Sequence, residues 1–286
     1  MARSYKYFLL MPAIAYLLVM GIFPLLFSLH AAFHSTVAGE YQFVFLRNFF
    51  RILEDARFLN TLRVTITIMI AVIAIELLIG LGMTFLLAYL KMKGITYTLT
   101  QVVLLLPIMM PPIVVGYTWR LILDPFIGPI NEIITSMGFS RVTFLTIPNT
   151  ALLSVILCTV WYWAPFAIVS LYAGFRNIPE ELYEAAAVDG ATGWRSHRYL
   201  TIPLLKQVIV TVILLRIMDL LKLFDIVFVL TSGGPGTSTE VVTLYNYIVG
   251  FKYFDTGYAS AISYIVLIFS IVISTIFSRL AMGEKK

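Results

Sequence analysis

Long apolar runs separated by short polar segments dominate the sequence. Each run is close to the roughly 20 residues that an α-helix needs to cross the hydrocarbon of a bilayer. The pattern therefore predicts an all-α membrane protein with six transmembrane helices, at about 7–29, 65–90, 101–123, 150–173, 204–230 and 258–280. Pro111 and Pro112 fall inside the third run and predict a break or kink there, because proline removes a backbone donor.

Composition agrees with a membrane protein. Of the 286 residues, 60% are hydrophobic and only 12% are charged, whereas soluble domains carry about 25% charged residues. The net charge of +5 is therefore interpreted as a topology signal rather than as nucleic-acid binding. The single cysteine, Cys158, lies in an apolar run, which excludes an internal disulfide and a thiolate metal site. No metal site is predicted.

Orientation follows from the placement of lysine and arginine. The first apolar run is longer than the roughly 7–15 residues of a signal peptide, so it is predicted to be an uncleaved span. With the N-terminus inside, the inner segments hold Arg3, Lys6, Lys91, Lys93, Arg176, Arg195, Arg198, Lys206, Arg279, Lys285 and Lys286. The outer loops hold Arg47, Arg51, Arg57, Arg63, Arg120, Arg141 and Lys252. The bias is modest, but both short termini are basic, so both are expected inside.

The predicted organisation is one transmembrane domain covering 1–286, with no linker or repeat. The sequence has neither a His-Glu-x-x-His zinc motif nor a Gly-x-Ser-x-Gly elbow, and no catalytic constellation emerges. The chain is accordingly predicted not to be an enzyme. Any energy source that this chain uses must then be an ion gradient or a separate subunit.

One polar segment, at 177–203, interrupts the apolar pattern and carries helix signals. Pro179 suits the first position of a helix, and Glu180 and Glu181 complement the helix dipole in its first turn. Gly190 suits the residue just past the helix end. The segment therefore predicts a short capped helix between spans four and five.

A second short helix is expected over Trp194–Leu200, before Pro203 opens span five. The loop 174–203 would then form a cytoplasmic helix–turn–helix, and the alanines at 185–187 would let another surface approach closely. An ordinary amphipathic connector lying on the membrane explains the same residues. The local pattern leaves both interpretations open.

The order of residues in this segment resembles the EAA motif. Glu184-Ala185-Ala186 is followed by Gly190 and then, after nine intervening residues, by Leu-Thr-Ile-Pro at 200–203. That motif marks the membrane subunits of binding-protein-dependent ATP-binding-cassette (ABC) importers. Residues 178–183 and the Leu-Thr-Ser-Gly-Gly-Pro sequence at 230–235 are similar to the sugar branch, the maltose/glycerol-phosphate-type permeases. His197 departs from the pattern at a position often occupied by Phe.

The resemblance implies the type I ABC importer permease fold and a carbohydrate importer driven by ATP, with a mono- or oligosaccharide or a polyol as cargo. This chain would form half of the pore in a bacterial or archaeal cytoplasmic membrane. The implied partners are a second permease subunit, two copies of an ATPase and an extracytoplasmic substrate-binding protein. No cofactor is expected in this chain, since ATP and Mg²⁺ would bind the ATPase. The implied ATPase-coupling residues are Glu184, Ala185, Ala186, Asp189 and Gly190.

Span five carries charged residues at three-residue spacing. These are Arg216, Asp219, Lys222 and Asp225. Charges at membrane depth cost roughly 2.5–3.5 kcal/mol each on insertion scales, so they face a cavity or pair with one another. One interpretation is two local ion pairs, Arg216 with Asp219 and Lys222 with Asp225. The other is a role in binding the substrate. The resemblance implies substrate-pathway positions at Arg216, Leu220 and Leu223, which would share one helix face. Asp219 is assigned to the same pathway, and Lys222 and Asp225 are predicted to be structural.

Aromatic residues in span four extend the predicted pathway. Trp163 and Phe166 match the resemblance, and aromatic faces stack on the C–H faces of sugar rings. Lipid-facing or core aromatics remain the alternative. Glu76, midway along span two, is expected to be protonated or paired with a neighbouring helix.

The loop after span five contains Gly233, Gly234 and Pro235. A phosphate loop is excluded because no Lys-Ser or Lys-Thr follows. The resemblance implies that this outer loop faces the binding protein. The alternative function for the whole chain is an ion-coupled secondary transporter that uses Glu76, Asp219 and Asp225 and needs no ATPase.

Overall fold

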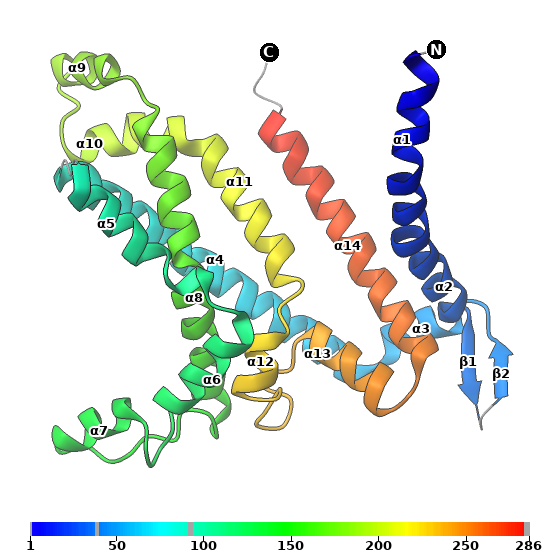
Figure 1. Cartoon of the computed structure of the whole chain (residues 1–286). Helices are drawn as coiled ribbons and strands as arrows, with labels where there is room; N and C mark the ends of the chain where they lie inside the picture. Colours follow the sequence, from blue (N-terminus) through cyan, green and yellow to red (C-terminus); the bar gives the residue numbers. More distant parts are fainter. Residues whose placement is uncertain (1, 38–39, 91–93, 283–286) are drawn as a thin grey trace. The chain divides into compact units, whose positions relative to one another are not determined.

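Helices account for most of the described backbone (Figure 1). The computed structural model describes residues 2–37, 40–90 and 94–282, and side chains from 9–35, 42–90 and 94–279. Lys91, Lys93, Lys285 and Lys286, which contribute to the predicted orientation, lie outside the described residues, as do the side chains of Arg3 and Lys6. The chain forms two compact units. One combines 1–59 with 245–269, and the other combines 60–244 with 270–286.

Five helical runs among the described residues are long and apolar enough to cross a membrane. They cover Leu9–Ala32, Ala56–Leu90, Pro148–Arg176, Trp194–Leu220 and Thr256–Arg279. The first consists of α1 (Ala2–Leu17), a π-helical turn at Leu18–Ile22 and α2 (Phe23–Ala32). Three others contain α4 (Ala56–Leu90), α8 (Pro148–Arg176) and α14 (Thr256–Met282), at predicted spans two, four and six.

The third predicted span, 101–123, is wrong as a single helix. The chain forms α5 (Gly94–Leu105), a 3₁₀ turn at Pro107–Met109 and then α6 (Pro112–Ile122). Met110 and Pro111 are extended, with ψ of 143° and 136°. Each precedes a proline, whose ring disfavours the α region for the residue before it. The break predicted from the two prolines is therefore confirmed.

The fifth predicted span, 204–230, is also wrong as one helix. The helix α11 (Ile202–Leu220) ends early, and α12 (Asp225–Leu230) follows after a short turn. Upstream, α10 (Trp194–Ser196) and a π-helical turn at His197–Thr201 continue into α11 without interruption. The predicted separate helix at 194–200 is thus joined to span five, because Pro203 sits in the first turn of α11, where a missing N–H is tolerated.

Several short elements were not predicted. Two strands, β1 (His34–Val37) and β2 (Glu40–Phe43), form an antiparallel hairpin in which His34 pairs with Phe43. The remaining additions are α3 (Arg47–Glu54), α7 (Pro129–Ser136) and α13 (Val242–Tyr247), which continues into a π-helical turn at Ile248–Lys252. The predicted all-α class is therefore right except for this hairpin. All these elements lie outside the long apolar runs on which the prediction was based.

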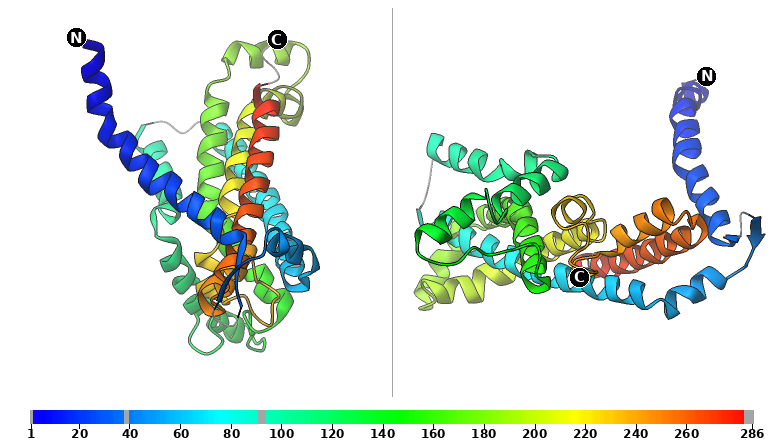
Figure 2. Two further views of the ribbon diagram at one scale, coloured as in Figure 1. Left: turned by 90° about the vertical axis from the view of Figure 1, so that its right-hand side faces the viewer. Right: turned by 90° about the horizontal axis from the view of Figure 1, so that it is seen from below.

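The larger unit is built around α8, which contacts α5, α6, α11 and α12. A β-carbon at Gly80 of α4 would lie 2.9 Å from the Leu171 side chain of α8, and one at Gly174 would meet Val208 of α11 at the same distance. Small residues let membrane helices approach closely in this way. Within this unit α9 (Glu180–Val188) and the loop after α12 lie at opposite ends of α8 (Figures 1 and 2).

In the smaller unit, a polar cluster holds the start of α4 to α13 and α14. One oxygen of Asp55 caps α4 by accepting the backbone N–H groups of Arg57 and Phe58, at 2.9 and 3.1 Å. The other oxygen accepts the hydroxyls of Tyr245 and Tyr258, at 2.5 and 2.7 Å. Burial by itself would raise the pKa of the Asp55 carboxyl, but these hydrogen bonds together hold the pKa below its ordinary value.

The charged form of Asp55 should therefore stabilise this unit at neutral pH. Because its folded pKa lies below the unfolded value of about 3.9, the contribution is complete above that pH and is lost as the pH falls through the folded pKa. Asp55→Asn is expected to lower the melting temperature at pH 7 and to remove part of the acid-induced decrease below about pH 4. Melting curves of both proteins between pH 3 and 8 test this. Parallel curves would contradict it.

Candidate substrate pathway and coupling segment

A buried ion pair joins α4 to α11. The Arg216 side chain donates from Nε to Glu76 Oε2 at 2.7 Å and from Nη2 to Glu76 Oε1 at 2.8 Å. The two side chains are 2% and 1% exposed. Of the two states predicted for Glu76, the structure therefore has the paired one. Both carboxylate oxygens accept N–H bonds, which is the bidentate geometry that arginine forms with an ionised carboxylate.

Three further predicted residues surround this pair. Arg216 Nη1 donates to Asp219 Oδ2 at 2.6 Å, and the Asp219 side chain is 42% exposed. The Arg216 guanidinium carbon lies 4.7 Å from the centre of the Trp163 ring, within cation–π range. Phe166 meets Trp163 edge to face, with 5.9 Å between ring centres. The structure thus gathers Glu76, Asp219 and Trp163 around Arg216, with Phe166 against Trp163.

The other residues of span five are arranged differently from the prediction. Leu220 is buried at the last position of α11, and Leu223 is half-buried in the following turn, where its carbonyl accepts the Thr243 hydroxyl. The helix ends before Leu223, so the common face predicted for Arg216, Leu220 and Leu223 is wrong. The Arg216–Asp219 pair is confirmed. Lys222 and Asp225 are exposed and, in the described part of the chain, do not pair, since α12 starts afresh at Asp225.

The candidate coupling segment, residues 174–203, contains the exposed helix α9, which ends at a capping glycine. Among the described residues of α9 none is buried. Gly190 has φ of +76° and its N–H bonds to Ala187 O at 3.1 Å, while the N–H of Ala191 bonds to Ala186 O at 2.8 Å. This pair of bonds is the Schellman motif, which requires a left-handed residue at the position of Gly190. The glycine stop predicted for this helix is confirmed.

The exposed surface of α9 carries the predicted coupling residues. Glu184, Ala185, Asp189 and Gly190 are exposed, and Ala186 is half-buried. The side chains of Glu184, Ala185 and Asp189 are therefore accessible to another protein surface.

Aromatic contacts attach the coupling segment to the membrane helices. The Tyr183 hydroxyl of α9 lies 2.9 Å from Thr201 Oγ1, and the Tyr183 ring packs near Phe175 of α8, at 6.0 Å between centres. His197 stacks on Phe85 of α4, with 4.3 Å between ring centres and 20° between planes. The imidazole thus makes a face-to-face contact of the kind an aromatic residue would make, which accounts for histidine at this position.

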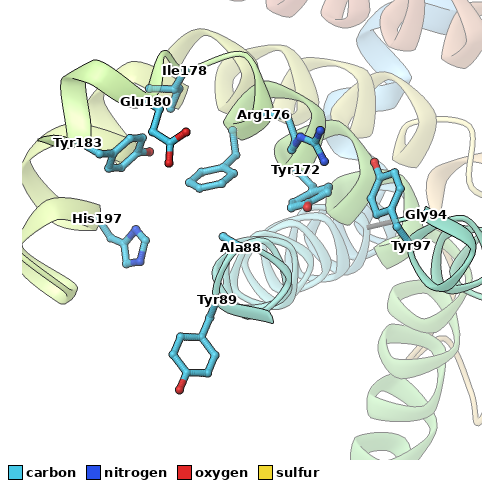
Figure 3. Close-up of a pocket in the computed structure, with 11 residues that line it drawn as sticks. Ala88, Tyr89, Gly94, Tyr97, Tyr172, Arg176, Ile178, Glu180, Tyr183 and His197 are labelled. Atoms are coloured by element: carbon cyan, nitrogen blue, oxygen red, sulfur yellow. The ribbon is translucent and has the colours of Figure 1, made fainter. Parts of the chain in front are cut away.

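A cavity of about 750 Å³ lies beside these contacts, and sequence reasoning missed it (Figure 3). Its walls come from the end of α4, the start of α5, the end of α8, and from α9 and the π-helical turn after α10. Tyr97, Tyr172, Tyr183 and His197 line it, together with Arg176, whose guanidinium lies 5.7 Å from the centre of the Tyr97 ring. No sequence signal could have found it, because the lining residues are far apart along the chain.

The glycine-proline loop after α12 is compact. Gly233 is buried and has φ of +86°, and a β-carbon there would approach Leu244 and Glu240 at 3.0 and 3.2 Å. Thr239 closes the loop by donating its hydroxyl to Gly234 O at 2.9 Å. Gly234 and Pro235 are half-buried. It stays a prediction that this loop, through Gly233, Gly234 and Pro235, faces a binding protein.

Within the described residues, no group of His, Cys, Asp and Glu side chains is arranged to hold a metal ion.

Comparison with known proteins identifies the class. Residues 77–282 match the family described as "Binding-protein-dependent transport system inner membrane component", and the chain belongs to this family. It is 34% identical over 284 residues to the trehalose/maltose transport system permease protein MalF of Thermococcus litoralis, covering 97% of this chain and 93% of that protein. It is 28% identical to the arabinooligosaccharides transport system permease protein AraP of Bacillus subtilis, covering 99% and 90%.

Solved structures show the same fold. The chain superimposes with a TM-score of 0.82 on a subunit of a bacterial ABC transporter involved in the import of the acidic polysaccharide alginate. The two share 24% identity, and the match covers 99% of this chain and 96% of that one. The fold is that of type I ABC importer permeases.

Proposed function

We propose that this chain is a permease subunit of an ATP-driven carbohydrate importer. The observation that carries the proposal is the similarity to the trehalose/maltose permease protein, which extends over 97% of the chain. Similarity to the arabinooligosaccharide permease protein supports the same cargo class. The aromatic and charged residues gathered around Arg216 provide stacking faces and hydrogen-bond acceptors suited to a sugar.

In this function the chain crosses the cytoplasmic membrane of a bacterium or archaeon six times. The five long helical runs supply five crossings, and the broken pair α5 and α6 supplies the other. Both termini and the loop 174–203 lie in the cytoplasm. The break in the third crossing and the early end of α11 leave non-helical backbone inside the protein, which membranes tolerate where it lines a cavity or is buried.

The partners follow from this role. A second permease completes the pore, two copies of an ATPase bind ATP and Mg²⁺, and an extracytoplasmic protein delivers the sugar. The alginate ABC transporter, which shares the fold, has been crystallised with a periplasmic protein carrying an alginate pentasaccharide. That complex supports a binding-protein partner, for which Gly233, Gly234 and Pro235 are the candidate contact.

Coupling runs through α9. Glu184 offers a carboxylate to the ATPase, Ala185 and Ala186 permit close approach, and Asp189 and Gly190 form the turn. When the ATPases close on ATP, α9 moves with them. Tyr183 and the stacked pair of His197 and Phe85 transmit that movement to α11 and α4.

Sugar uptake by proteoliposomes containing the complex with its co-expressed partners tests this function. Uptake should require ATP, and Glu184→Gln should reduce ATP-dependent uptake about tenfold or more because a charge-assisted contact is lost. Glu132→Gln, at an exposed carboxylate of α7, is the matched control and should transport normally. Uptake that follows an imposed proton or sodium gradient without ATP would instead support the ion-coupled alternative.

A further inference from the structure

The Arg216 side chain is buried, and carboxylates and an aromatic ring of the protein surround its guanidinium. Three of its N–H groups donate to Glu76 and Asp219, its face lies against Trp163, and its side chain is 2% exposed. A cation that recognises an anionic sugar must present free donors to the carboxylate or sulfonate of that sugar. Arg216 is therefore placed to hold other side chains rather than to bind an anion directly.

Asp219 is the member of this cluster that reaches outward. Its carboxylate has one oxygen bound to Arg216, and its side chain is 42% exposed, whereas Glu76 is 1% exposed. Two carboxylates share the one guanidinium, so Arg216 presents no unbalanced positive charge to a substrate, and Asp219 is the charged group accessible from outside the cluster. Lys222 and Asp225, which follow in the chain, are exposed and have opposite charges.

A half-exposed carboxylate within a predicted span does not face lipid hydrocarbon without a large penalty. It faces either a water-filled pathway or a cation of a neighbouring subunit. Trp163 lies against the guanidinium that binds Asp219, and Phe166 packs on Trp163. These aromatic faces favour the pathway, because a carboxylate that accepts hydroxyls in the same cluster as an aromatic face suits an uncharged polyhydroxy compound.

We propose that Asp219 is the substrate-facing charge of this pathway, that Arg216 positions it, and that the cargo is an uncharged sugar or polyol rather than an acidic one. The inference rests on the proposed function and adds the charge class of the substrate. The carboxylate of Asp219 accepts sugar hydroxyls and repels uronates and other sugar acids.

The test uses a reporter thiol in the complete complex. Cys158, the only cysteine of the chain, is buried and is replaced by Ala. Leu215, which is exposed and one helical turn from Asp219, is replaced by Cys. Two methanethiosulfonate reagents are then compared: a cationic one with a trimethylammonium-ethyl group and an anionic one with a sulfonatoethyl group. Their rates of reaction with the introduced thiol are measured in this protein and in the same protein carrying either Asp219→Asn or Glu132→Gln.

The expected result is that the cationic reagent reacts faster after correction for intrinsic reactivity. Asp219→Asn should reduce the cation-to-anion rate ratio about tenfold, as one unit charge several ångströms away would do in water. Glu132→Gln should leave the ratio unchanged.

Three outcomes overturn the proposal. The first is no reaction of the thiol introduced by Leu215→Cys in any nucleotide state, which would place this face against another subunit or lipid. The second is a ratio that Asp219→Asn does not change. The third is uptake of a probe acid, trigalacturonate, by the unmodified complex. In each of these outcomes, ATP-dependent sugar uptake can still be measured. If it persists, the Asp219 proposal has failed while the proposed importer function stands, so the failure of one is distinguishable from the failure of the other.

Discussion

Replacing Glu76 by Gln is expected to lower the free energy of unfolding by about 3–5 kcal/mol, the usual cost of removing one partner from a buried ion pair. Glu76 accepts two bonds from Arg216, and both side chains are almost completely buried. In the variant the guanidinium stays buried with only Asp219 as a charged partner. Thermal unfolding of the purified complex, followed by the loss of monodisperse protein, measures the effect.

Two further variants make this prediction specific. Asp219→Asn should cost much less, because the Asp219 side chain is half-exposed and solvent already screens its pair with Arg216. Replacing both partners by apolar residues, Glu76→Leu with Arg216→Met, should recover most of the stability, since a buried pair can be replaced by hydrophobic groups of similar volume at little cost. Equal losses in the three proteins would show that the pair does not hold α4 to α11.

Replacing Gly190 by Val is expected to abolish most ATP-dependent uptake without unfolding the membrane helices. The residue has φ of +76°, a conformation that costs a residue with a β-carbon roughly 1–2 kcal/mol and a β-branched residue more. Nothing lies within 4 Å of a β-carbon there, so the backbone conformation alone is tested. Loss of the Schellman end should disorder the face of α9 that carries Glu184 and Asp189, and uptake should fall about tenfold or more.

A matched control is available at the other end of the unit. Gly138, just past the end of α7, also has a positive φ, of +85°, and nothing lies within 4 Å of its β-carbon position. Gly138→Val introduces similar strain away from α9 and should leave ATP-dependent uptake largely intact. If both variants lose uptake equally, general strain rather than coupling explains the result.

Much of the fold could be predicted because membrane helices must satisfy their own backbone and be apolar over a set length. The runs that became α4, α8 and α14 follow this rule directly. Proline chemistry predicted the break between α5 and α6, and capping chemistry predicted the end of α9 at Gly190. The end of α11 at Leu220 was not predicted, because neither a proline nor a glycine marks it in the sequence.

The candidate site shows where sequence reasoning ended. The charges of Arg216 and Asp219 could be predicted to pair, since they are three residues apart on a helix. That Arg216 also binds Glu76, which is 140 positions away, had no local signal. The same limit applies to the cavity lined by Tyr97, Tyr183 and His197.

The sequence by itself determined the class of the protein, the unbroken membrane helices, the short helix that ends at Gly190 and the residue types available for a sugar, because hydropathy, capping and motif spacing are local properties. Only the tertiary structure decided which charges neutralise one another. It placed Glu76 against two N–H donors of Arg216 and left Asp219 partly exposed, because ion pairing within the protein depends on which helices pack together. That packing changes the expected role of Arg216 from binding a substrate to positioning Asp219, the carboxylate that we propose binds it.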